Sequence, residues 1–470
     1  MSYERTEIAG SEIEIQQGIM ARVRGISAER ALPPLATVIT FGCQQNEADS
    51  EKLRGMLREM GYGFTENENE ADIIVINTCA IREHAEQRVL GNVGALIHSK
   101  REKPGQLIAL CGCMVSRPEM AAKIKRSYRH VDILFGVHQL WRFPEFLADA
   151  LETKRRIITT SDERGSVVEG LPSLRDGSVK AWLSIMYGCN NFCSYCVVPY
   201  VRGRERSRRP DLILDEAREL IARGYKDITL LGQNVNSYGG DLPDSINFAT
   251  LLREINAIPG DFLIRFMTSH PKDAGDELFS AMADCEKVAR HIHLPFQAGS
   301  DRVLSMMNRR YTQAEYLALV ESARRHMPDI VVTSDIIVGF PGETEDEFRE
   351  TLHVLREARF DALFTFIFSK RPGTPAAEMP DPATKAEKQR WFDELLVLQN
   401  SISEAKHAEY AGKTMRVLVD GKSDDDASEL RARTNGGRLV RLPGGDELIG
   451  EFIDVKITHS NTWALYGEPV

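Results

Sequence analysis

Eight cysteines are the residues of this chain best suited to metal or redox chemistry. Three of them form a compact triplet on one short loop, Cys189-Asn-Asn-Phe-Cys193-Ser-Tyr-Cys196. A structural zinc site needs four ligands, and no other cysteine or histidine lies between His138 and His270. The spacing therefore favours an iron–sulfur cluster held by three cysteines, with one iron open to a substrate or cofactor. Three cysteines that merely pack on a loop are the alternative.

A second set of cysteines is dispersed along the chain. Cys43, Cys79 and Cys113 each directly follow a predicted strand. These strands are 37–42, 72–77 and 107–112. Because the carboxyl ends of parallel strands share one sheet edge, the three thiols are expected to converge as a second cluster site. The alternative is three unrelated buried cysteines. Cys111 lies inside a strand and Cys285 near a helix end, so both are interpreted as packing residues.

The elements around the dispersed cysteines predict a parallel α/β domain over residues 35–150. Strands alternate there with helix-length segments, such as 47–60 and 80–99. Residues 1–34 are interpreted as a poorly ordered leader with one helical turn. Residues 151–178 are polar and are interpreted as an interdomain linker.

Residues 179–405 predict six further βα units. Their number is below the eight of a closed barrel, so an open (β/α)6 partial barrel is expected, with function at the carboxyl ends of its strands. The predicted strands are 181–187, 227–232, 263–268, 291–296, 331–338 and 362–368, and the predicted helices are 212–223, 247–257, 274–284, 312–326 and 345–358.

Residues 406–470 change to a period of two, with glycine-rich turns between short strands. This pattern predicts a small C-terminal antiparallel β-barrel of a kind that often binds oligonucleotides. Basic residues do not outnumber acidic ones in this segment. Contact with nucleic acid and a purely structural role therefore both stay open.

Composition limits the other function classes. The 470 residues are 42% hydrophobic and 27% charged, as in a folded globular protein. No apolar run has the ~20 residues of a membrane helix, and no signal peptide is recognised, so a cytoplasmic protein without membrane contact is expected. The net charge of −10 requires any nucleic-acid contact to come from a local patch.

The best local patch follows the cysteine triplet directly. Five arginines fall within eight positions and are expected to contact RNA phosphates. They are Arg202, Arg204, Arg206, Arg208 and Arg209. A surface loop whose arginines pair with neighbouring acids is the alternative.

The triplet, with an aromatic residue before its last cysteine, resembles the radical S-adenosylmethionine superfamily. The two cysteine sets, followed by a β-domain, resemble the methylthiotransferases over about 35–470. The matching stretches are Thr40-Phe-Gly-Cys-Gln44, Asn77-Thr-Cys-Ala-Ile-Arg82, Gly188-Cys-Asn-Asn-Phe-Cys193, Pro199-Tyr-Val-Arg-Gly-Arg-Glu-Arg-Ser-Arg208, Leu231-Gly-Gln-Asn-Val-Asn-Ser-Tyr238, His293-Leu-Pro-Phe-Gln-Ala-Gly-Ser300 and Gly339-Phe-Pro-Gly-Glu-Thr344.

The resemblance implies two [4Fe-4S] clusters and a TRAM-like C-terminal domain. Cys189, Cys193 and Cys196 would hold the cluster that cleaves S-adenosyl-L-methionine to a radical. The dispersed cysteines would hold an auxiliary cluster that carries the sulfur to be delivered. Tyr195 would lie near the adenine of S-adenosylmethionine, and Gln233 and Asn234 are expected to line the same pocket. An external one-electron donor and a sulfur source are also implied.

Within the family, the motifs look like the bacterial branch that methylthiolates carbon 2 of N(6)-isopentenyladenosine beside the tRNA anticodon. S-adenosylmethionine would be both methyl donor and radical source. The alternatives are a threonylcarbamoyl adenosine target, a ribosomal-protein side chain, or a non-catalytic iron–sulfur or zinc module that binds RNA. Two positions depart from the family pattern: Phe368 stands where a tyrosine is expected, and Ala298 replaces a serine. Both concern local substrate or cofactor contacts.

Overall fold

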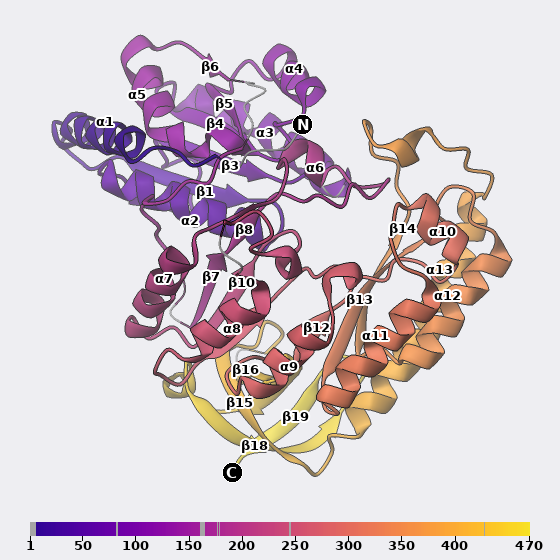
Figure 1. Cartoon of the computed structure of the whole chain (residues 1–470). Coiled ribbons are helices and arrows are strands. Elements are labelled where there is room, and N and C mark those ends of the chain that lie inside the picture. The colour runs from indigo at the N-terminus through magenta and orange to yellow at the C-terminus, as the bar shows by residue number, and fades with distance from the viewer. Residues whose placement is uncertain are drawn as a thin grey trace. The chain divides into compact units, whose positions relative to one another are not determined.

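The dispersed cysteines lie in a unit built on one parallel sheet. A computed structural model describes residues 6–80, 83–159, 165–175, 177, 179–243, 246–426 and 428–470, with side chains of 83–85 excepted. The first of two compact units comprises Met1–Asp176, Tyr187–Asn190 and Val197–Arg206. Its sheet has the strand order β2-β1-β3-β4-β5-β6 (Figure 1). The strands are β1 (Leu35–Thr40), β2 (Gly63–Phe64), β3 (Ile73–Thr78), β4 (Leu107–Gly112), β5 (Ile133–Gly136) and β6 (Ile157–Ile158).

Helices pack on both faces of this sheet, because its central strands are apolar on both sides. On one face the core joins α1, α2 and α5 to residues such as Ile73 and Val75. On the other, α3 and α4 pack against residues such as Ile74 and Ile76. The helices are α1 (Gly10–Ala28), α2 (Gln44–Glu59), α3 (Glu83–Glu102), α4 (Pro118–Ser127), α5 (Phe143–Thr153) and α6 (Val198–Val201), with the 3-10 turn η1 (Val137–Arg142). The predicted parallel α/β domain is therefore confirmed.

The leader is more structured than the sequence pattern indicates. Instead of one turn, the 19-residue helix α1 begins at Gly10. Its residues Met20 and Val23 are buried in the core with α2 and α5, which orders the segment. Residues 1–5 of the predicted leader lie outside the described residues. The prediction of a poorly ordered leader is thus wrong over α1, because tertiary packing stabilises a helix whose own periodicity is weak.

The predicted linker also contributes structure. Strand β6 pairs with β5, and Arg175 forms an ion pair with Glu51 at 3.3 Å. Residues 160–164, 176 and 178 of this segment lie outside the described residues. The chain first passes from one unit to the other at residues 176–177.

The second unit contains the six predicted βα strands as two parallel three-stranded sheets, β11-β10-β7 and β12-β13-β14. Residue Ile264 bridges to Val288, beside β12. An open partial barrel is therefore confirmed. Its strands are β7 (Lys180–Ser184), β10 (Asp227–Leu231), β11 (Leu263–Phe266), β12 (His291–His293), β13 (Val331–Val338) and β14 (Ala362–Ile367). Short strands β8 (Met186–Tyr187) and β9 (Arg206–Ser207) lie where the chain passes between the units.

One large apolar core fills the space between these strands and their helices. Three of the helices begin with a Thr-x-x-Glu capping box, which satisfies the first amide groups. The helices are α7 (Pro210–Ala222), α8 (Phe248–Asn256), α9 (Asp276–Asp284), α10 (Asp301–Met306), α11 (Gln313–His326), α12 (Glu345–Ala358) and α13 (Lys385–Ala408), with 3-10 turns η2 (Val235–Ser237), η3 (Pro271–Asp273) and η4 (Pro375–Glu378).

The last strands of the second unit close into a barrel of order β15-β16-β17-β19-β18 (Figure 1). The pairings are antiparallel except that of β17 with β19, which is parallel. The predicted small β-barrel is confirmed, with this one departure from an all-antiparallel arrangement. Its elements are β15 (Thr414–Lys422), β16 (Glu429–Thr434), β17 (Leu439–Pro443), η5 (Asp446–Leu448), β18 (Phe452–Ser460) and β19 (Leu465–Pro469).

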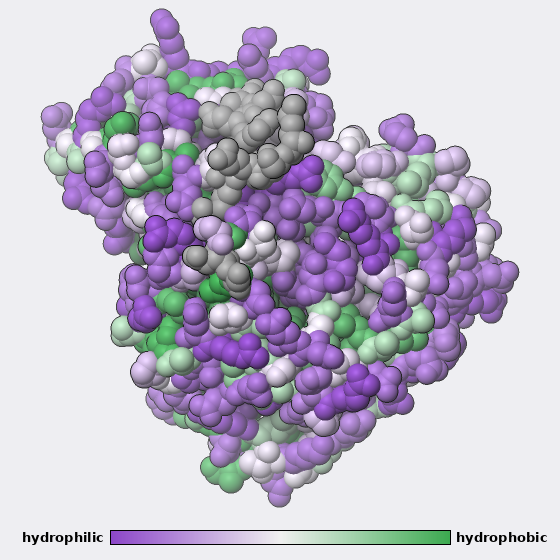
Figure 2. All heavy atoms as spheres, viewed as in Figure 1, coloured by the Kyte–Doolittle hydropathy of each residue, from purple (hydrophilic) through white to green (hydrophobic). Residues whose placement is uncertain are grey.

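The barrel packs on the rest of the second unit through buried charges. Arg265 of β11 donates to the carbonyls of Thr434 and Asn435 at 3.1 and 2.8 Å. Asp420 accepts from Lys180 of β7. On the face in Figure 2, hydrophobic residues are scattered among hydrophilic ones. In the described part of the chain, no helix combines the length and apolar character needed to cross a membrane.

Candidate functional site

Three adjacent strands bring the dispersed cysteines to one edge of the first sheet. Cys79 and Cys113 directly follow β3 and β4, and Cys43 lies three residues after the end of β1. These strands are neighbours in the sheet. The register aligns the strand ends, with Thr78 opposite Gly112. Burial is the main cause that raises the pKa of the Cys113 thiol to about 12; Arg202 opposes this rise, and Cys79 and Cys43 contribute to it. The fold therefore places the three cysteines after neighbouring strands, and their role as cluster ligands stays a prediction.

Polar side chains at this edge fix the strand ends. Asn46 at the start of α2 donates to the Asn77 side-chain oxygen at 3.1 Å, and Asn77 donates back to the Asn46 carbonyl at 2.9 Å. Gly112 has φ +98°, and a Cβ there would lie 2.4 Å from Asn77 Oδ1. None of these three residues was assigned a role from the sequence. Asn46 and Asn77 lie close to Cys43 and Cys79 in the sequence, which is the signal that could have found them.

A buried ion pair adjoins the third cysteine. The Arg202 Nε donates to Cys113 Sγ at 3.1 Å, and its Nη2 donates to Asp49 Oδ2 at 2.8 Å. Both charged side chains are almost fully buried. Val197 and Val201, at α6, form a small apolar cluster with Cys113. A guanidinium directed at a buried sulfur favours the thiolate form, which is the form that binds metal.

The thiols of this donor set are of the type that holds iron–sulfur clusters. No three His, Cys, Asp or Glu side chains in the described ranges are arranged around a single ion. In an iron–sulfur cluster each thiolate binds a different iron. Three thiols that follow neighbouring strands, with a buried guanidinium that donates to one sulfur, supply donors of this kind.

The triplet loop contributes residues to both units: Cys189 belongs to the first, and Cys193 and Cys196 belong to the second. In the first unit, the Cys189 amide donates to the Gly203 carbonyl at 3.1 Å. Gly188 has φ +77°, and a Cβ there would lie 2.0 Å from the Arg204 carbonyl oxygen, so only glycine fits. The chain is thereby turned tightly just before Cys189.

In the second unit, Cys193 and Cys196 lie on a short turn anchored to the end of α10. The Ser194 amide donates to the Met307 carbonyl at 3.0 Å, and the Cys196 amide donates to the Cys193 carbonyl at 2.9 Å. Arg309 Nη1 donates to Cys193 Sγ at 3.5 Å. This arginine is 116 positions from Cys193 and was not found from the sequence.

Tyr195 lies on this turn, among buried groups. It packs against the core of the second unit. Burial raises its pKa well above the usual value, as do Cys193 and Cys196, whereas Arg309 lowers it. The phenol is therefore neutral at physiological pH. Its predicted contact with adenine stays a prediction.

Gln233 and Asn234 follow the carboxyl end of β10, as predicted for pocket residues. Asn234 is 1% exposed and donates to Asp273 Oδ2 at 2.7 Å. Its buried Oδ1 has no partner in the described chain, so it can accept a hydrogen bond from a ligand.

The Gly339–Thr344 turn is held by Glu343, which accepts from the Gly339 amide at 2.6 Å.

The predicted patch of five arginines is corrected by the structure. Arg202, Arg206 and Arg208 are buried, at 4%, 3% and 7% exposure. Arg206 donates to the Arg204 carbonyl, and Arg208 donates to Glu216 Oε2 at 2.8 Å. Their guanidinium groups are directed into the protein, where they form hydrogen bonds within the chain. The exposed members are Arg204 and Arg209.

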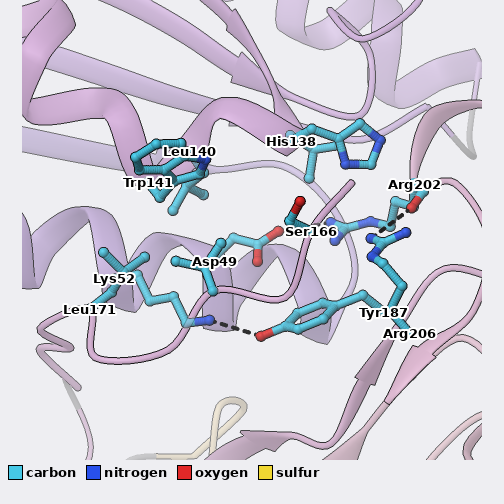
Figure 3. Close-up of a pocket in the computed structure, with 12 residues that line it drawn as sticks. Asp49, Lys52, His138, Leu140, Trp141, Ser166, Leu171, Tyr187, Arg202 and Arg206 are labelled. Carbon is cyan, nitrogen blue, oxygen red and sulfur yellow. Dashed lines mark hydrogen bonds and ion pairs between the residues drawn. The ribbon is translucent and has the colours of Figure 1, made fainter. Parts of the chain in front are cut away.

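A small cavity adjoins the buried arginines in the first unit (Figure 3). Lys52 reaches across it to donate to the Tyr187 hydroxyl at 3.0 Å. Burial, Arg206 and Arg202 lower the pKa of His138 to about 4, so this imidazole is neutral at pH 7. Arg202 lines this cavity and also contacts Cys113, so it lies between the cavity and the cysteine edge.

Comparisons with known proteins agree with the three parts of the fold. Residues 36–136 match Uncharacterized protein family UPF0004, residues 183–355 match the Radical SAM superfamily, and residues 408–470 match the TRAM domain. Among solved structures, the radical S-adenosylmethionine methyltransferase TsrM from Kitasatospora setae is similar with a TM-score of 0.55 and 17% identity, over 74% of this chain and 77% of that one. At this identity the likeness concerns the fold alone.

Similarity to curated proteins extends over nearly the whole chain. The tRNA-2-methylthio-N(6)-dimethylallyladenosine synthase of Acetivibrio thermocellus is 51% identical over 431 residues, which cover 92% of this chain and 90% of that protein. The protein of the same name from Thermoanaerobacter sp. is also 51% identical, over 92% of each chain. This chain therefore belongs to the tRNA-2-methylthio-N(6)-dimethylallyladenosine synthase family of radical S-adenosylmethionine proteins.

Proposed function

We propose that this protein replaces hydrogen by a methylthio group at carbon 2 of N(6)-isopentenyladenosine next to the anticodon of tRNA. This proposal rests on the 51% identity to a synthase of that name over 92% of the chain. These names also favour this target over threonylcarbamoyl adenosine or a ribosomal-protein side chain. A non-catalytic RNA-binding module would leave the radical S-adenosylmethionine domain without use.

Two sets of side chains would hold the cofactors. Cys189, Cys193 and Cys196 would bind one [4Fe-4S] cluster, and the converging Cys43, Cys79 and Cys113 a second. When bound, the clusters and S-adenosylmethionine would supply the one-electron chemistry, the sulfur and the methyl group. Tyr195, Gln233 and Asn234 would orient S-adenosylmethionine, since they lie on the triplet turn and at the carboxyl end of β10.

The remaining partners follow from this chemistry. The exposed Arg204 and Arg209 would contact tRNA phosphates, together with the TRAM barrel. The bases of an anticodon loop are accessible without opening a duplex, which suits recognition by stacking and base edges. An external electron donor, a sulfur source and a cytoplasmic location complete the proposal.

The proposal is tested in a bacterial strain that lacks its own synthase. Mass spectrometry of tRNA nucleosides should detect 2-methylthio-N(6)-isopentenyladenosine when this chain is expressed. Cys113→Ala should abolish the product, whereas Cys285→Ala, in the apolar core, should retain it. A methylthio group found only on threonylcarbamoyl adenosine or on a protein would refute the target.

A further inference from the structure

Each unit places one buried arginine against the sulfur of a candidate cluster cysteine. Arg202 Nε lies 3.1 Å from Cys113 Sγ in the first unit, and Arg309 Nη1 lies 3.5 Å from Cys193 Sγ in the second. The two arginines are 4% and 8% exposed. Burying a guanidinium costs desolvation free energy unless the charge interacts with partners inside the protein. The partners of these two arginines therefore indicate what their charges do.

The two arginines differ in what else they contact. Arg202 also donates to Asp49 Oδ2 at 2.8 Å, and this carboxylate is itself 5% exposed. Gln45 donates to the other carboxylate oxygen at 3.3 Å, which holds Asp49 in place. The positive charge near Cys113 is therefore offset by a negative charge on the same guanidinium.

Arg309 has neutral oxygen partners instead. Its Nε donates to the Tyr311 hydroxyl at 2.9 Å, and its Nη2 donates to the Pro295 carbonyl. Burial raises the pKa of Tyr311, so the phenol carries no charge at pH 7. The full positive charge of Arg309 thus acts on Cys193.

These differences have a predictable effect on an iron–sulfur cluster. Reduction adds one negative charge, so a nearby cation and an N–H···S hydrogen bond both favour the reduced state and raise the potential. A carboxylate beside the cation cancels much of the charge effect while the hydrogen bond remains. In a buried site such charges are weakly screened.

We propose that these contacts set the reduction potentials of the two clusters separately. Arg309 raises the potential of the cluster held by Cys189, Cys193 and Cys196, which lets an external one-electron donor reduce it. Asp49 limits the same effect of Arg202 on the auxiliary cluster. Arg202, Asp49 and Arg309 are positioning residues here, and the inference rests on the proposed cluster assignment.

The experiment measures each cluster alone. One protein carries alanine at Cys43, Cys79 and Cys113, and the other carries alanine at the three triplet cysteines. Redox titration followed by electron paramagnetic resonance then gives each midpoint potential. Arg309→Gln should shift the triplet-cluster potential to a more negative value. The midpoint potential of Arg309→Lys should lie between those of Arg309→Gln and the parent.

Asp49→Asn should shift the auxiliary-cluster potential in the opposite direction, to a more positive value. Opposite signs are the decisive result, because general damage to a site does not produce them. Arg302→Gln is the charge-matched control, since Arg302 is exposed and pairs with Glu347 rather than a thiol. Its midpoint should equal the parent value.

Potentials unchanged within error in Arg309→Gln and Asp49→Asn, or shifted with the same sign, would overturn the inference. If Arg309→Gln assembles no cluster, Arg309→Lys decides, and an unchanged midpoint there also overturns it. If the parent proteins bind no iron and sulfide, the proposed function itself fails, and the two failures are thereby distinguished.

Discussion

At the scale of single residues, Glu343 shows how burial makes one carboxyl sensitive to pH. It is 3% exposed, and burial raises its pKa to about 7 although the Gly339 and Phe340 amides donate to it. The folded state therefore binds this proton more tightly than the unfolded state, whose pKa is near 4.5. Between these values the contribution of Glu343 to stability falls as pH rises.

Glu343→Gln keeps an oxygen acceptor for the two amides and removes the charge. We expect the free energy of unfolding of the parent to fall, relative to this variant, by on the order of 3 kcal/mol from about pH 4.5 to about pH 8. Urea unfolding of both proteins across that range measures it. Parallel pH profiles would show that Glu343 does not titrate in this window.

At the scale of elements, the end of β4 positions Cys113. A Cβ at Gly112 would lie 2.4 Å from Asn77 Oδ1 and 2.5 Å from the Thr78 carbonyl oxygen, and φ is +98°. Gly112→Ala should therefore push β4 away from β3 and prevent the auxiliary cluster from assembling. The iron content of the reconstituted protein should fall from about eight atoms per chain to about four.

Iron and sulfide analysis checks this, together with S-adenosylmethionine cleavage, which should persist because the triplet is untouched. Gly105→Ala is the matched control, since nothing lies within 4 Å of its added Cβ. Full iron content in Gly112→Ala would contradict the role assigned to this strand end.

At the scale of the whole molecule, Asp361 connects the β-barrel to the partial barrel within the second unit. This 3% exposed carboxylate accepts from the Val332 amide at 2.8 Å, from Lys406 at 3.1 Å and from Arg438. Asp361→Asn leaves the buried Arg438 and the half-buried Lys406 without their counter-charge. The expected loss of stability is about 3 kcal/mol, with faster amide exchange over β15–β19.

Urea unfolding and hydrogen exchange measure these effects. Asp261→Asn is the control, because Asp261 pairs with Arg416 at an exposed position and should cost about 0.5 kcal/mol. Equal exchange rates in the Asp361→Asn variant and the parent would mean that other contacts hold the barrel.

The amino-acid sequence alone was enough to predict the strand–helix alternation and the two cysteine sets. Apolar periods and strand ends are local properties, so the pattern around Cys43, Cys79 and Cys113 was sufficient to assign all three to one sheet edge. The packing roles of Cys111 and Cys285 followed from the same reasoning, and both are buried in apolar cores.

Tertiary structure decided what the arginines do. Their count and spacing indicated an RNA surface, yet Arg202 lies inside, against a thiol 89 positions away, and Arg309 reaches a thiol 116 positions away. Such contacts depend on how strands and loops pack, and a long flexible side chain carries no local sign of the direction it takes. The same holds for α1, whose order comes from the core it covers.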